Sequence, residues 1–63
     1  MKIFEVIEDT DTIYVTRSES KACEKALLCE KEHVWIVEMI MDSYPHQERV
    51  WNDLDDFRKE YSV

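Results

Sequence analysis

The sequence predicts an α+β fold: a three-stranded sheet in the element order strand, strand, helix, strand, helix, with one helix on or near each face. Three observations predict it: alternating polar and apolar residues near the amino terminus and again in the middle, a helix-forming segment between them, and a helical period at the end. A chain of 63 residues has room for a single domain, residues 1–63, with one small core.

Two short alternating segments predict a β-hairpin at the start of the chain. In Lys2–Glu8, the side chains of Phe4 and Val6 fall on the same face. Residues Thr12–Arg17 are mostly β-branched or aromatic, which favours a half-buried strand. The polar break at residues 9–11 contains no glycine, and neither does the rest of the chain. We therefore expect Asp, Asn or Ser to supply any backbone position with positive φ.

A helix-forming segment follows this hairpin. Ser18 is the expected N-cap, since its hydroxyl is able to accept a hydrogen bond from a free amide at the helix start. Glu19 follows in the first turn, where the helix dipole favours negative charge, and the helix is expected to run to about Lys31. Its buried face is a stripe of small residues that lets the helix lie close to the sheet: Ala22, Cys23, Ala26 and Cys29.

The remaining chain predicts a third strand and a second helix. Residues His33–Asp42 are apolar on most of both faces, as in a central strand or one covered on both sides. The helical crossover before this strand permits parallel pairing with a neighbour. Pro45 interrupts the strand. From about His46 to Tyr61, apolar residues at helical spacing predict a helix over the sheet face that the first helix leaves bare: Val50, Leu54, Phe57 and Tyr61.

The charge of the chain narrows the possible partners. Fifteen acidic against eight basic residues give a formal charge of −7. Such a protein repels DNA and RNA, because binding phosphates needs clustered Lys and Arg. It is attracted to basic clefts of proteins that hold nucleic acid; the alternative is a merely solvated, soluble surface. The predicted partner-binding residues are Glu8, Asp9, Asp11, Glu38, Asp42, Asp53, Asp55, Asp56 and Glu60.

No sequence pattern predicts catalysis, a metal or a cofactor. A nucleophile needs a pocket and an orienting partner, for which this glycine-free chain offers little concave backbone. Cys23 and Cys29 lack the paired short spacing of zinc sites, and residues 9–11 lack the glycine and distal Glu of a calcium loop. We expect two reduced thiols, no signal peptide and no membrane span, hence a cytoplasmic protein.

The apolar residues exceed the needs of one small core. Those expected in the core are Trp35, Met39, Met41, Trp51 and Phe57. Those in surplus are Ile3, Ile7, Leu28 and Tyr44. If the surplus residues lie exposed beside carboxylates, they form the kind of patch that binds proteins. The alternatives are a homodimer interface or an ordinary scatter of exposed apolar groups.

Residues 12–26, with the sequence TIYVTRSESKACEKA, combine a strand, a serine cap and a helix with alanines four apart. Together with the strand that follows, this segment resembles the β-β-α-β core of small phage and mobile-element proteins. These include phage inhibitors of host RNA polymerase, some anti-CRISPR proteins and the DpnD/PcfM-like domains. The resemblance covers residues 2–42 and assigns no binding residue. It implies a small non-enzymatic inhibitor that acts on a nucleic-acid machine in the host cytoplasm. The alternative function is a regulatory or assembly module that dimerises through its third strand or final helix.

Overall fold

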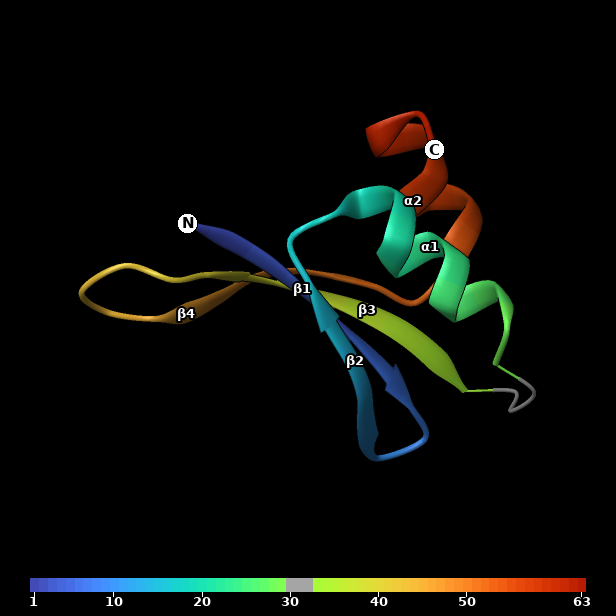
Figure 1. The fold of residues 1–63 in the computed structure, drawn as a ribbon, viewed down its shortest axis with the longest axis horizontal. Helices are drawn as coiled ribbons and strands as arrows, with labels where there is room; N and C mark the ends of the chain where they lie inside the picture. Colours follow the sequence, from blue (N-terminus) through green and yellow to red (C-terminus); the bar gives the residue numbers. More distant parts are fainter. Residues whose placement is uncertain (30–32) are drawn as a thin grey trace.

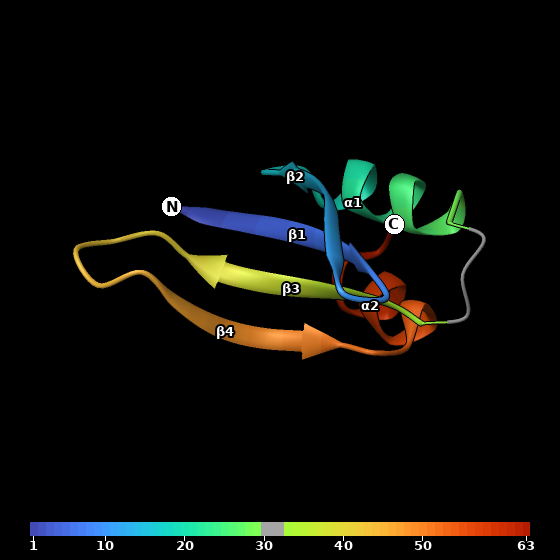
Figure 2. The same ribbon diagram turned by 90° about the horizontal axis from the view of Figure 1, so that it is seen from below.

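The computed structural model describes residues 1–29 and 33–63. The elements are β1 (Lys2–Glu8), β2 (Asp11–Thr16), α1 (Glu19–Leu27), β3 (Val34–Ile40), β4 (His46–Trp51) and α2 (Leu54–Tyr61). The strands form one antiparallel sheet in the order β2-β1-β3-β4, as Figure 2 shows. In the described part of the chain, no helix has the length and apolar character needed to cross a membrane.

The α+β class agrees with the sequence, but the three-stranded sheet is wrong, because residues 46–51 form a fourth strand and not the start of a helix. β4 pairs antiparallel with β3, from Trp51 opposite Ile36 to His46 opposite Ile40. β1 occupies the other edge of β3, so the backbone groups of this apolar strand find partners on both sides. β3 is therefore central, but its pairing with β1 is antiparallel. β1 also separates it from β2, the strand at the other end of the helical crossover.

The second helix begins later than predicted. α2 starts at Leu54, after Asp53, whose side chain accepts a hydrogen bond from the backbone N–H of Asp55 at 2.9 Å. An acceptor at this position satisfies one of the free amides of the first turn and fixes where the helix begins. The helical spacing between Val50 and Leu54 thus crosses the boundary between a strand and a helix.

Both helices lie on one face of the sheet, which corrects the prediction of one helix on each face (Figure 1). α1 contacts β1, β2 and β3, α2 contacts β3 and β4, and the two helices contact each other. Only two residues separate β4 from α2, and Trp51 at the end of β4 packs against Phe57 and Tyr61 of α2. The connection therefore returns α2 to the same face. The shared core consists of Phe4, Val6, Ala22, Cys23, Ala26, Ile36, Trp51 and Phe57.

The structure confirms the start and the buried face of the first helix. The Ser18 hydroxyl accepts a hydrogen bond from the backbone N–H of Lys21 at 3.2 Å. Three of the predicted small residues are buried against the sheet, and Cys29 is partly exposed. The helix ends at Leu27, earlier than the predicted end near Lys31, since Leu28 and Cys29 are not helical; residues 30–32 lie outside the described residues. Both cysteines are free thiols.

Residues other than glycine adopt positive φ, as predicted. Asp9, in the turn between β1 and β2, has φ of 57°, and Ser62, after α2, has φ of 56°. The backbone N–H of Asp9 also donates to the carbonyl of His33 at 2.8 Å. This hydrogen bond ties the turn to the residue that precedes β3.

The predicted core residues divide into two groups. Trp51 and Phe57 are buried, 7% and 0% exposed. Trp35, Met39 and Met41 are only partly buried, since they lie on β3 or just beyond it and outside the shared core. Of the residues predicted to be in surplus, Leu28 and Tyr44 are highly exposed, whereas Ile3 and Ile7 are partly buried.

Candidate functional site

Two acidic segments lie at the same end of the sheet. β1 and β4 are both antiparallel to β3, so the turn after β1 and the connection after β4 emerge at one end, the right-hand end in Figure 2. Residues 8–11 and 52–56 contain no Lys or Arg. We call their six carboxylates the acidic end: Glu8, Asp9 and Asp11 from the turn, and Asp53, Asp55 and Asp56 from the connection and the first turn of α2.

Part of the acidic end also stabilises α2. Asp53 caps the helix, and Asp55 and Asp56 lie in its first turn, where the helix dipole favours negative charge. All three are exposed, so these local roles leave their charge open to solvent. A partner is therefore able to reach the same carboxylates.

Asp42 and Glu60 lie apart from the acidic end. The Asp42 side chain accepts a hydrogen bond from the backbone N–H of Tyr44 at 2.8 Å, in the β3–β4 hairpin that projects away from the helices (Figure 1). Glu60, in the last turn of α2, accepts a hydrogen bond from Arg49 of β4 at 2.8 Å. Asp42 therefore lies at the opposite end of the sheet, and Glu60 takes part in a contact between α2 and β4.

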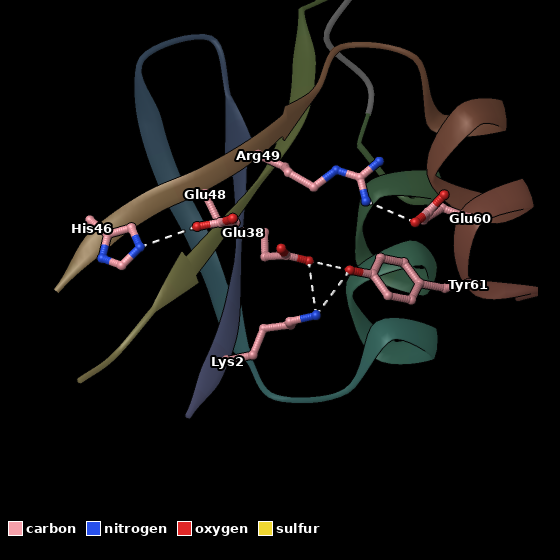
Figure 3. Close-up of polar contacts among 7 residues, drawn as sticks. All are labelled: Lys2, Glu38, His46, Glu48, Arg49, Glu60 and Tyr61. Atoms are coloured by element: carbon pink, nitrogen blue, oxygen red, sulfur yellow. Dashed lines mark hydrogen bonds and ion pairs between the residues drawn. The ribbon is translucent and has the colours of Figure 1, made fainter.

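Glu38, another predicted partner-binding residue, is buried. It is 2% exposed and lies on β3, on the face covered by the helices. The Tyr61 hydroxyl donates a hydrogen bond to its carboxylate, and Lys2 Nζ lies 3.5 Å from the same oxygen (Figure 3). Burial and the hydrogen bond to Glu38 raise the pKa of Tyr61, so its phenol stays a proton donor. These contacts satisfy Glu38 inside the fold, and it is not available to a partner.

Arg49 joins β4 to α2 beside this network. Its guanidinium lies over the Trp51 ring, 4.6 Å from the ring centroid. The same guanidinium donates a hydrogen bond to Glu60 (Figure 3). The hydrogen bond from Arg49 lowers the pKa of Glu60. The contribution of this pair to stability is therefore present above the ordinary pKa of Glu and is lost as the pH falls through the lowered value.

His46 provides a pH-dependent contact in the β3–β4 hairpin. Its Nδ1 lies 2.9 Å from the Tyr44 carbonyl oxygen. Its Nε2 lies 3.1 Å from Glu48 Oε2 (Figure 3). Both ring nitrogens donate when the ring is protonated. The hydrogen bond to the Tyr44 carbonyl, aided by Glu48, raises the pKa of His46. The stabilisation is complete below the ordinary His pKa of about 6.5 and is lost as the pH rises through the raised value.

We expect Glu48→Gln to lower the pH midpoint of His46, because the ring loses its anionic neighbour. Proton NMR titration of the His46 ring measures the midpoint directly. Asp56→Asn, which removes one charge from the acidic end, is the control and should leave the midpoint nearly unchanged. An equal shift in both variants would mean that general charge, and not the Glu48 contact, sets the pKa of His46.

The other described acidic side chains form no ion pair. Within residues 1–29 and 33–63, the pairs are Lys2–Glu38, His46–Glu48 and Arg49–Glu60. None involves the acidic end. The negative charge of that end is therefore not compensated by a close cation of the described chain. Glu30 and Glu32, further acids near the first helix, lie outside the described residues.

The described residues show no arrangement typical of catalysis or metal binding. No group of three or more His, Cys, Asp or Glu side chains within residues 1–29 and 33–63 is placed to hold a metal ion. Burial and the neighbouring Glu8 raise the pKa of the Cys29 thiol, the opposite of what a nucleophile needs. A groove of about 630 Å³ separates α1 from the end of the chain and includes Leu27, Leu28 and Val63 in its lining. It offers apolar surface and no paired reactive groups.

No protein-family model matches the chain, and no curated protein or solved structure proved similar to it. The resemblance to small phage inhibitors therefore stays a prediction from the sequence pattern.

The two residues that contact the buried Glu38 carboxylate were not predicted from the sequence. Lys2 and Tyr61 reach Glu38 from opposite ends of the chain, and no local pattern links such distant positions. One signal was present: Glu38 interrupts an otherwise apolar row of β3, between Ile36 and Ile40. Where such a row faces the core, a single acid in it indicates a buried, paired carboxylate rather than a surface one.

Proposed function

We propose that this protein is a non-enzymatic, cytoplasmic inhibitor that binds a basic, nucleic-acid-binding surface of a host protein and competes with DNA or RNA. A phage-encoded inhibitor of the anti-CRISPR or transcription-inhibitor type fits this description. One observation carries the proposal: the acidic end gathers six carboxylates from two separate chain segments and pairs none of them with a close cation within the described residues.

The proposed mechanism is electrostatic competition. Charges spaced over the turn and the start of α2 take the place of the phosphates that a basic cleft normally holds. Complementary potential speeds the encounter, and the bound domain then blocks nucleic acid by its volume. Because four of these acids are exposed and Glu8 and Asp9 are partly exposed, the contact is screened by salt over about 8–10 Å.

The test is affinity capture from host lysate with the tagged protein, followed by displacement of labelled DNA or RNA from each captured nucleic-acid-binding protein. A triple variant, Asp11→Asn, Asp55→Asn and Asp56→Asn, is expected to weaken displacement at least about tenfold, since it removes three complementary charges. Wild-type affinity should also fall steeply between about 50 and about 300 mM salt.

A matched control removes three charges elsewhere: Glu19→Gln, Glu24→Gln and Glu48→Gln. It should retain displacement within about threefold. Equal losses in both triple variants would assign the effect to net charge alone. Binding that does not depend on salt would contradict competition through the acidic end.

The alternative, an assembly module that dimerises through its third strand or final helix, has less support. Both edges of β3 are paired within the sheet, and Phe57 of α2 is fully buried in the core of its own chain. Sedimentation over a range of concentrations separates the two proposals. A monomer supports the inhibitor, and a stable dimer supports assembly.

A further inference from the structure

The face of the sheet opposite the helices is apolar over its middle, with the charge of Glu5 among the apolar residues and polar Thr12 and Gln47 at its edges. The register aligns Val15, Glu5, Val37 and Val50 in a single row across β2, β1, β3 and β4. Two further pairs flank the row, Ile7 with Trp35 and Ile3 with Met39. We call these eight residues the open face: Ile3, Glu5, Ile7, Val15, Trp35, Val37, Met39 and Val50.

Neither helix covers the open face. α1 and α2 both pack on the opposite side, over Phe4, Val6 and Ile36. Val15 is 51% exposed and Val50 is 42% exposed at the two edges of the row, whereas Val37 inside the row is only 5% exposed between its neighbours. The other five residues of the open face are partly exposed. A contiguous apolar surface of this kind, with a partly exposed Trp and Met, is typical of sites where proteins bind.

Glu5 decides which partner fits. It forms no ion pair within the described residues, and its neighbours on its own strand and directly across from it are apolar. Water solvates the carboxylate while the face is open. A surface that covers the face removes this water, and a buried carboxylate without a cation is strongly destabilising. The covering surface must therefore bring a positive charge.

The open face of a second copy does not supply that charge. Two open faces stacked at the usual sheet spacing of about 10 Å would place two Glu5 carboxylates in one apolar layer. None of the eight open-face positions is Lys or Arg. Each copy also carries a formal charge of −7, which adds repulsion.

We infer that the open face docks a partner protein whose surface presents apolar side chains around one Lys or Arg, and that this cation pairs with Glu5. Trp35 and Met39 are the apolar anchors. The inference goes beyond the proposed function, because the open face and the acidic end are different surfaces. It stands even if the acidic end binds no nucleic-acid-handling protein.

The experiment uses two synthetic peptides as probes, one of alternating leucine and lysine and one of alternating leucine and glutamate. The readout is the protection of Trp35 from acrylamide quenching, because Trp51 is buried in the core at 7% exposure and changes little. The leucine–lysine peptide is expected to protect Trp35. Glu5→Gln should weaken that protection at least about tenfold, and Glu5→Lys should transfer the preference to the leucine–glutamate peptide.

Asp55→Asn with Asp56→Asn is the control for charge, and should change the protection of Trp35 less than about threefold. This control also separates the two proposals, since it alters the acidic end and leaves the open face intact. Unchanged circular dichroism and core Trp51 emission establish that the Glu5 variants are folded.

Three results would overturn the inference. The first is equal protection of Trp35 by both peptides, and the second is no protection by either. The third is a stable wild-type dimer, seen by sedimentation, in which Trp35 is already protected, since a second copy would then cover the open face.

Discussion

Phe57→Ala is expected to leave the protein largely unfolded at room temperature. Phe57 is fully buried, and its ring packs at 5.6 Å from that of Phe4 and at 5.0 Å from that of Trp51, both edge to face. Truncating a buried Phe to Ala costs about 3–5 kcal/mol. A core of this size rarely supplies more than about 3–5 kcal/mol in total. The loss therefore matches the whole free energy of unfolding.

Urea denaturation followed by circular dichroism and Trp fluorescence measures this effect. Leu28→Ala is the matched control, since Leu28 is 68% exposed and its truncation should change the free energy of unfolding by less than about 0.5 kcal/mol. A Phe57→Ala protein with a cooperative transition and a loss below about 1 kcal/mol would mean that α2 does not hold the sheet.

The features predicted correctly from the sequence are those that depend only on residues close together in the chain. The Ser18 cap needs only the amides of the next turn, and Phe4 and Val6 share a face by strand alternation alone. The need for non-glycine residues at positive φ also followed from composition, and Asp9 and Ser62 fill that role. Each of these features is fixed within a few residues.

The fourth strand could not be predicted in the same way. Residues 46–51 have only Val50 and Trp51 as apolar side chains, which is typical of an edge strand, and β4 has one neighbouring strand among the described residues. Together with Leu54 and Phe57 these two side chains have helical spacing, although the Asp53 cap starts the helix only at Leu54. The free edge of β3, and not the local sequence, decides that this segment is a strand.

The open face and the acidic end could not be predicted either, because both depend on where the helices and β4 lie. With one helix on each face, the expected sheet had no open side, and Trp35 and Met39 counted as core. Once both helices pack on one face, these residues become surface, and Glu5 becomes the centre of that surface. The carboxylates of the acidic end likewise lie together because of β4, which brings Asp53 to the same end of the sheet as Asp9.

Tyr61→Phe is expected to destabilise the protein by about 1.5–3 kcal/mol, the usual contribution of a hydrogen bond to a charged group. Glu38 is 2% exposed, and Tyr61 is its hydroxyl donor, so the variant leaves a buried carboxylate with Lys2 as its remaining polar contact. Urea denaturation at neutral pH measures the loss. Tyr44→Phe removes the same hydroxyl from a residue that is 84% exposed and should change stability by less than about 0.5 kcal/mol.

A double-mutant cycle and a pH series then establish that the effect belongs to the pair. Replacing both partners, Glu38→Leu with Tyr61→Phe, should cost less than the sum of the single losses, because no carboxylate remains to be satisfied. The pKa of Tyr61 is raised in the folded protein, so its contribution is complete below the ordinary Tyr value of about 10. Above that pH the unfolded chain loses its proton first, and stability falls. The difference between wild type and Tyr61→Phe should therefore shrink as the pH rises beyond about 10, and a difference that stays constant would show that Tyr61 acts through packing alone.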